Sequence, residues 1–200
     1  MNVRVLTVIA DDAGLDPHTD DAILAAARAG TVHGAAVTAT GRTAVLFVRR
    51  ALREGLPVGL HLDLTEGRPL SGCLPGLTDA EGHWPGGKSA LASAPATTES
   101  LLADELHLQW RRLVRAGAQP AFVNGHNHVH ALPPVAHALC AALDAMAASA
   151  FGSSGSAVRM PRARACPSPV CWTSYSPSAS ACQTSRRAPA TACSTPWRTT

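Results

Sequence analysis

Two adjacent aspartates, Asp11 and Asp12, are the first residues of the chain whose type and position suggest chemistry. They follow a short β-branched, aliphatic stretch, residues 5–10, which predicts a strand buried on both faces. Neighbouring side chains of a regular strand point to opposite faces, but at a strand end, where the pleat gives way to a loop, both can reach one site. Two carboxylates at the mouth of a parallel sheet are costly unless a cation or a reaction uses them. We therefore expect a functional site at this strand end.

Histidines follow at two later strand ends. The segment 56–65 carries polar side chains at alternate positions on one face: His61, Asp63 and Thr65. The segment 121–125 runs directly into three more histidines at alternate positions: His126, His128 and His130. If this run is extended, its three imidazoles share one face, which a solvated loop has no reason to arrange. Both segments therefore supply candidate partners for the aspartates.

One carboxylate with two imidazoles is a common ligand set for a divalent metal ion that keeps open positions for water and substrate. Such an ion makes water more acidic and polarises a carbonyl group, and a nearby carboxylate that is not a ligand suits a general base. Ordinary structural roles stay open for each group. The aspartates can form a solvated turn or helix cap, His61 can be a core histidine with Asp63 as its partner, and one or two later histidines can merely line the pocket.

The elements around these residues alternate between strands and helices. Apolar patterns, with Pro17 and two glycines as start and stop signals, predict four helices, at residues 16–28, 43–53, 100–116 and 133–148. Strands are expected at residues 5–10, 32–40, 56–65 and 121–125. This order is typical of an α/β fold with a parallel sheet or barrel. Residues 66–98 are longer than most loops and are expected to form a lid or substrate-binding insertion, in which Trp84 either stacks on a ligand or packs in the core.

Composition limits the class of protein. A formal net charge of +3 and no basic stripe with aromatic residues argue against binding of nucleic acid or an anionic membrane. No apolar segment approaches the ~20 residues of a membrane span, and no signal peptide is recognisable, so we expect a cytoplasmic protein. The cysteine spacing fits neither a zinc ribbon nor a disulfide framework.

The last part of the chain, residues 164–200, changes to a Ser/Arg/Pro/Cys-rich composition that cannot bury much apolar area. It is expected to be a disordered tail or, as the composition favours, the product of a reading-frame shift in the coding sequence. Residues 1–163 then form the folded domain.

Three blocks of the chain resemble the YdjC-type carbohydrate deacetylases, which include the chitooligosaccharide deacetylases and hopanoid-biosynthesis deacetylase-like proteins. The blocks are residues 10–15 (ADDAGL), 58–70 (VGLHLDLTEGRPL) and 124–130 (NGHNHVH). The resemblance implies a (β/α) barrel of the glycoside hydrolase/deacetylase type, here incomplete at the C-terminus. It further implies metal-dependent hydrolysis of an N-acetyl group on an amino-sugar-containing carbohydrate, with Mg²⁺ or Zn²⁺ as cofactor. It assigns the metal to Asp12, His61 and His126, and the base role to Asp11.

Several possibilities remain beside this reading. His128, His130 or Asp63 is expected to line the substrate pocket or to protonate the leaving group. Another metallohydrolase, of the phosphoesterase type, can use the same ligand set. An inactive, truncated fragment is the third possibility, because an incomplete barrel has open sheet edges that favour association, including a homo-oligomer.

Overall fold

The computed structural model describes residues 5–151 and shows a parallel four-stranded α/β sheet. Its strands lie in chain order: β1 (Ile9–Ala13), β2 (Gly34–Thr38), β3 (Val58–Leu62) and β4 (Val123–Gly125). All neighbouring pairs are parallel, so the carboxyl ends of the strands meet at one edge of the sheet. The predicted α/β class and parallel sheet are confirmed. Closure into a barrel stays a prediction, because the strands of the described part form an open sheet with β1 and β4 outermost.

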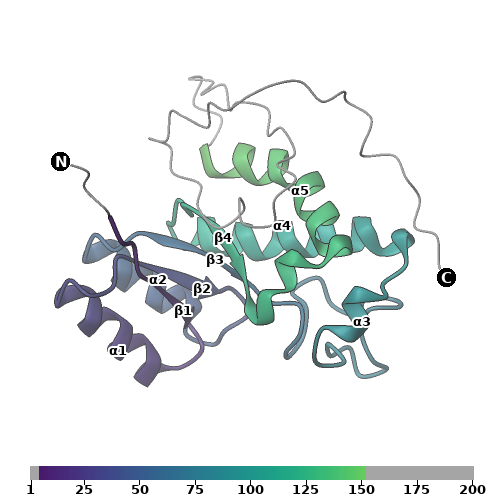
Figure 1. The fold of residues 1–200 in the computed structure, drawn as a ribbon, viewed down its shortest axis with the longest axis horizontal. Helices are drawn as coiled ribbons and strands as arrows, with labels where there is room; N and C mark the ends of the chain where they lie inside the picture. Colours follow the sequence, from purple (N-terminus) through teal and green to yellow (C-terminus); the bar gives the residue numbers. More distant parts are fainter. Residues whose placement is uncertain (1–4, 152–200) are drawn as a thin grey trace.

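Helices connect the strands as the apolar pattern predicts (Figure 1). The longer ones are α1 (Pro17–Arg28), α2 (Ala44–Arg53), α4 (Glu99–Arg115) and α5 (Pro133–Phe151). Asp16 caps α1, because its side chain accepts hydrogen bonds from the backbone amides of His18 and Thr19. Helices α4 and α5 pack against each other, and α4 also contacts β3. None of the helices between residues 5 and 151 is long and apolar enough to cross a membrane.

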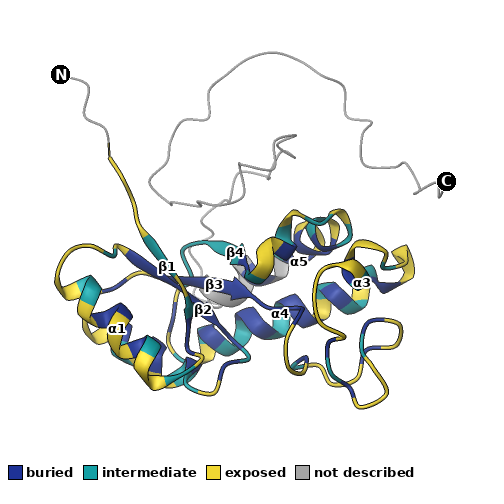
Figure 2. Ribbon diagram, turned by 60° about the horizontal axis from the view of Figure 1, so that its bottom comes forward, coloured by how far each residue is buried: buried dark blue, intermediate teal, exposed yellow. Residues whose placement is uncertain are grey.

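The centre of the sheet forms the core. Every residue of β2 and β3 is buried (Figure 2), as expected for parallel strands covered by helices. Helix α2 places Phe47, Val48 and Ala51 in this core. This packing fixes the position of the carboxyl ends of β2 and β3.

The first strand differs from its prediction. Strand β1 begins only at Ile9, and the side chains before it are exposed: Val5 is 84% and Leu6 79% accessible (Figure 2). The expectation of a strand buried on both faces is therefore wrong for this stretch. The reason is topological, because β1 pairs only with β2 within the described residues and leaves its other edge open.

The long connection after β3 contains two short helices, α3 (Ser89–Ala92) and η1 (Ala96–Thr98). Trp84 is only 4% accessible and packs in the core, which decides against its role as a sugar platform. Its backbone amide donates to the carbonyl of Gly67, and the buried Glu105 of α4 accepts from the amides of Leu70 and Ser71. The beginning of this connection is therefore tied to the body of the domain.

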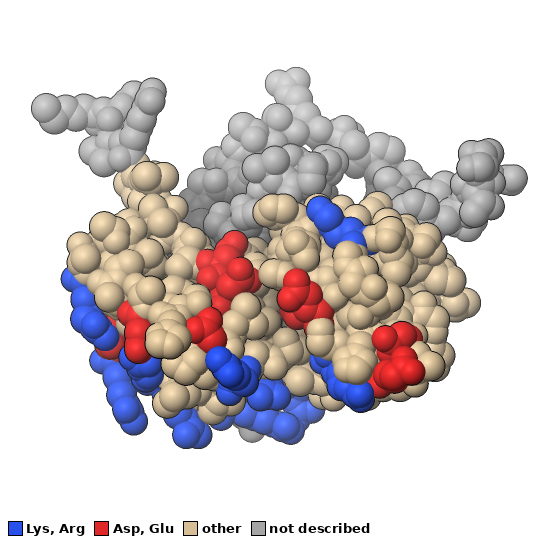
Figure 3. Space-filling model, turned by 90° about the horizontal axis from the view of Figure 1, so that it is seen from below, with Lys and Arg blue, Asp and Glu red and all other residues tan. Residues whose placement is uncertain are grey.

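Positive charge is carried largely by the outer helices, since α2 and α4 both end in arginines. On the face shown in Figure 3, acidic side chains lie across the middle and at the lower right, and most Lys and Arg side chains gather along the left and lower rim. The domain boundary expected at residues 163/164, and the tail that follows it, lie outside the described residues.

Candidate metal centre

A bulge at the end of β1 brings both aspartates to one edge of the sheet. Ala10 pairs with Ala35 and Ala13 with Val37, so three steps along β1 oppose two along β2. Asp12 sits in this irregularity with a left-handed backbone, φ 60°. In a regular pleat Asp11 and Asp12 would point to opposite faces, and the extra residue removes that alternation.

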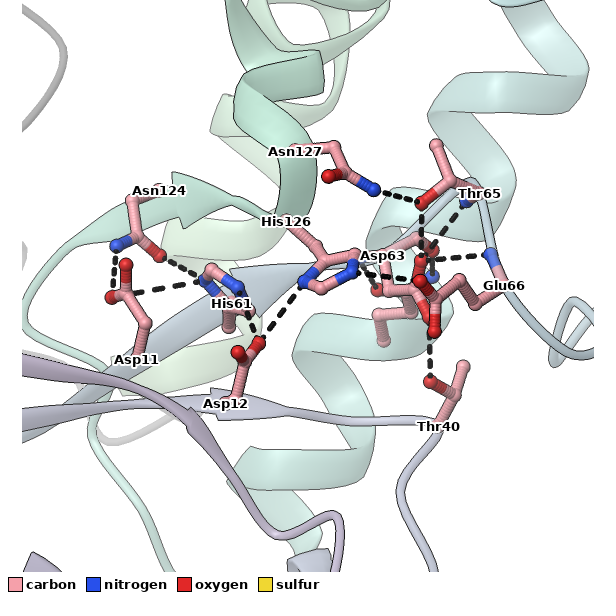
Figure 4. Close-up of polar contacts among 11 residues, drawn as sticks. Asp11, Asp12, Thr40, His61, Asp63, Thr65, Glu66, Asn124, His126 and Asn127 are labelled. Carbon is pink, nitrogen blue, oxygen red and sulfur yellow. Dashed lines mark hydrogen bonds and ion pairs between the residues drawn. The ribbon is translucent and has the colours of Figure 1, made fainter. Parts of the chain in front are cut away.

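Asp12 contacts two histidines from two other strand ends. Its Oδ1 lies 3.0 Å from Nε2 of His61, in β3, and 3.0 Å from Nδ1 of His126, which directly follows β4 (Figure 4). One ligand atom from each of these three residues lies within 4.8 Å of the others, so the group could hold a metal ion. The donor chemistry fits this use, since one carboxylate and two imidazoles converge from three segments. His61 is 3% accessible, which excludes water from that side of the centre.

Asn124, the residue before Gly125 in β4, links His61 to Asp11. Its Oδ1 lies 2.7 Å from Nδ1 of His61, and its Nδ2 donates to Oδ1 of Asp11 at 2.7 Å. Figure 4 shows the resulting row of side chains from Asp11 through Asn124 and His61 to Asp12 and His126. Asp11 itself is about half exposed, at 49% of its side chain, and so stays open toward solvent beside the three candidate ligands.

Glu66 contacts His126 through the ring nitrogen that does not face Asp12. Its Oε1 lies 3.1 Å from Nε2 of His126, whose Nδ1 faces Asp12. Burial lowers the pKa of His126, but the hydrogen bond with Glu66 and the attraction of Asp12 outweigh burial, and the net shift of its pKa is upward. Without a metal ion, His126 therefore holds a proton more readily than an ordinary histidine.

Asp63 has a structural task in the described fold. Its Oδ1 accepts hydrogen bonds from the amides of Thr65 and Glu66 and from the hydroxyl of Thr65. These bonds form a tight turn at the end of β3. Gln109 of α4 holds the same turn by bonding both the amide and the carbonyl of Asp63. Asp63 thereby shapes the backbone that presents Glu66.

The histidine run is not extended. Asn127 and His128 adopt left-handed backbone angles, φ 53° and 58°, within the turn η2 (His126–Ala131). The expectation that three imidazoles share one face is wrong, because period-2 alternation holds only for an extended chain. His126 points to Asp12 and Glu66, whereas the rings of His128 and His130 lie 6.2 Å apart in an edge contact.

His130 lies half buried behind the centre. A Cβ on Gly125 would come within 2.8 Å of its Nδ1, so the glycine leaves the room that this ring occupies. Burial, followed by repulsion from His128 and His61, lowers the pKa of His130, which keeps its imidazole neutral near neutral pH. His128 is exposed.

Comparison with known proteins decides the family. The sequence profile of the YdjC-like proteins matches residues 5–195, nearly the whole chain. This chain belongs to the YdjC-like family. The predicted resemblance is confirmed.

Relatives of this YdjC-like chain include a carbohydrate deacetylase of Mus musculus, 35% identical over 147 residues, or 70% of this chain and 47% of the relative. A chitooligosaccharide deacetylase of Yersinia enterocolitica is 37% identical over 138 residues, or 66% and 53% of the two chains. The chain thus spans about half the length of these curated relatives. A crystal structure of a candidate cellobiose-phosphate cleavage protein of Enterococcus faecalis has the same fold, with TM-score 0.62 and 20% identity over 70% of this chain and 55% of the other.

Sequence reasoning missed two residues of this YdjC-like site, Asn124 and Glu66. Asn124 lies in β4 next to His126, and Glu66 lies in the turn that follows β3 and His61, so proximity in the sequence to a candidate ligand was the available signal. Their partners lie far away in the sequence: 113 residues separate Asn124 from Asp11, and 60 separate Glu66 from His126. Only the assembled sheet shows these contacts.

Proposed function

We propose that this chain is a metal-dependent hydrolase that removes an N-acetyl group from an amino-sugar-containing carbohydrate. The observation that carries the proposal is the convergence of Asp12, His61 and His126 beside the half-exposed carboxylate of Asp11, which is not one of the three candidate ligands. The names of the related deacetylases support the choice of an amide bond in a carbohydrate. Two imidazoles favour Zn²⁺ over Mg²⁺, which prefers oxygen ligands.

Asp12, His61 and His126 would hold the metal ion, which supplies Lewis acidity toward a water molecule and the amide carbonyl. Asp11 is the proposed general base, since its carboxylate stands next to the ligands, half exposed and oriented by the amide of Asn124. The oxygen of water bonds to the carbonyl carbon while its proton passes to Asp11. The C–N bond then breaks, the sugar nitrogen takes up a proton, and acetate and a free amine leave.

The proton for the leaving amine requires an acid. We propose His128 or His130 for this role. The lowered pKa of His130 argues against a proton held on its own ring. Asp63 is a weaker candidate, because its Oδ1 is occupied by three donors of its own turn. We further propose a cytoplasmic location and an N-acetylated carbohydrate as the substrate.

The test measures bound metal and released acetate together, on purified chain supplied with N-acetylglucosamine oligomers. We compare the parent with Asp11→Asn and, as a matched control, Asp104→Asn, whose carboxylate lies exposed on α4. Loss of general base catalysis should lower acetate release by about 10²–10⁴-fold in Asp11→Asn, with metal content unchanged. The control should match the parent.

Two results would overturn the proposal. Bound metal without acetate release from any N-acetylated oligomer would rule out the deacetylase reaction, and hydrolysis of a phosphate monoester in the same samples would favour the phosphoesterase alternative. A parent chain that binds no divalent metal and melts without cooperativity would instead support the inactive fragment.

A further inference from the structure

We propose that Asn124 is a positioning residue that fixes which nitrogen of His61 faces the metal centre and holds Asp11 beside it. This inference rests on the proposed metal centre. It assigns a role to a residue that is neither a ligand nor the base, and it predicts a measurable effect on metal binding without reference to any substrate.

The orientation of the Asn124 amide follows from its two partners. A carboxylate only accepts hydrogen bonds, so the contact of 2.7 Å with Asp11 must come from the NH₂ end of the amide. The carbonyl end then faces Nδ1 of His61 at 2.7 Å, and a carbonyl also only accepts. Nδ1 of His61 must therefore carry the proton in this bond.

The tautomer of His61 has a direct consequence for the centre. With its proton on Nδ1, a neutral His61 keeps a free electron pair on Nε2, and Nε2 is the atom that lies 3.0 Å from Oδ1 of Asp12. A metal ligand must present this electron pair. The opposite tautomer would point an N–H into the centre. Asn124 thereby selects the form of His61 that can bind.

Strand register places Asn124 for this task. His61 of β3 is directly paired with Asn124 of β4, as Leu60 is with Val123. Directly paired residues on neighbouring strands put their side chains on the same face of the sheet, in contact. Since His61 is 3% accessible, water has little access to replace this partner, and the hydrogen bond to Asn124 is the one that orients the ring.

The second ligand offers an internal comparison. Nε2 of His126 contacts Glu66, whose side chain is 67% exposed. Water can replace the hydrogen bond of an exposed partner such as Glu66 more easily than the hydrogen bond that Asn124 makes with the buried His61. We therefore expect the loss of Asn124 to weaken metal binding more than the change Glu66→Ala does.

Cobalt binding tests the inference, because Co²⁺ reports its ligand geometry through visible absorption. We compare the parent with Asn124→Leu, which has neither polar atom, and Asn124→Asp, which keeps an acceptor for Nδ1 of His61. Loss of such a supporting contact typically lowers metal affinity by about 10–100-fold, so Asn124→Leu should bind Co²⁺ more weakly by this factor and with an altered spectrum. Asn124→Asp keeps the acceptor for His61 but loses the donor to Asp11 and places a second carboxylate against it, so it should bind Co²⁺ more tightly than Asn124→Leu and more weakly than the parent.

A role of Asn124 in folding alone would not give this pattern. Urea unfolding in EDTA measures the stability of each variant without metal, and Asn124→Ala serves if the leucine variant does not unfold cooperatively. Equal Co²⁺ affinity and spectra of parent and Asn124→Leu would overturn the inference, as would an Asn124→Asp variant that binds as weakly as Asn124→Leu. If the parent itself binds no Co²⁺, the metal centre and the proposed function fail first.

Discussion

The left-handed backbone of Asp12 makes a sharp prediction about stability. A non-glycine residue at φ near 60° costs roughly 1–2 kcal/mol, because its Cβ approaches the following carbonyl group. The site retains this cost because the bulge is what turns the carboxylate toward His61 and His126. We expect the cost to be released by glycine and retained by alanine.

The test compares Asp12→Gly with Asp12→Ala, since both variants lack the carboxylate and differ only in Cβ. Glycine should make the folded chain about 1 kcal/mol more stable than alanine, after allowance for the greater freedom of glycine in the unfolded chain. Both variants should lose metal binding.

Ala13 provides the matched control. It is the next residue in β1, its side chain is fully buried, and its φ is not positive. Ala13→Gly should therefore destabilise the chain by about 1–2 kcal/mol, from the added freedom of glycine and the loss of a buried methyl group. Glycine in place of alanine should thus raise the free energy of unfolding at position 12 and lower it at position 13.

Urea unfolding in EDTA, followed by circular dichroism, measures all four chains without any contribution from bound metal. Equal m-values are required for the comparison. If Asp12→Gly is no more stable than Asp12→Ala, the strain at Asp12 is not real and the bulge needs another explanation.

Three further predictions follow from single contacts. Glu105 is fully buried, and its carboxylate accepts hydrogen bonds from the amide and hydroxyl of Ser71 at 2.8 and 2.7 Å. Glu105→Leu should therefore lower the free energy of unfolding, measured in urea titrations, by about 2–4 kcal/mol. A loss below about 1 kcal/mol would show that Glu105 does not anchor the segment that contains Ser71. The raised pKa of His126 means that protonation favours the folded chain. In EDTA, the stability that His126 contributes should be fully present below pH 6.5, its ordinary pKa, and should be lost as the pH rises through the raised pKa of the folded state. The free energy of unfolding, measured across this range, should depend less on pH in Glu66→Gln than in the parent. An equal pH dependence would refute the assignment to Glu66. Leu6, exposed beside the open edge of β1, should promote association, so Leu6→Lys should shift sedimentation toward the monomer; an unchanged distribution would exclude this edge.

The sequence alone determined the secondary-structure elements, and the family resemblance singled out the candidate metal ligands among its aspartates and histidines. Helices α1, α2, α4 and α5 lie within a few residues of their predicted bounds, because apolar periodicity and local caps define a helix from nearby residues. The placement of Asp12, His61 and His126 at strand ends also follows from the sequence. In a parallel sheet such ends meet at one edge, so three distant segments are brought to one place by connectivity.

Only the tertiary structure decided the geometry of the centre. The bulge at Asp12 depends on pairing with β2, and the partner of His61 depends on the register of β3 against β4. The left-handed turn at Asn127 and His128 breaks the alternation by which the sequence grouped His126, His128 and His130. These features arise from contacts between residues far apart in the chain. Local pattern places a residue at a strand end, whereas long-range pairing decides where its side chain points.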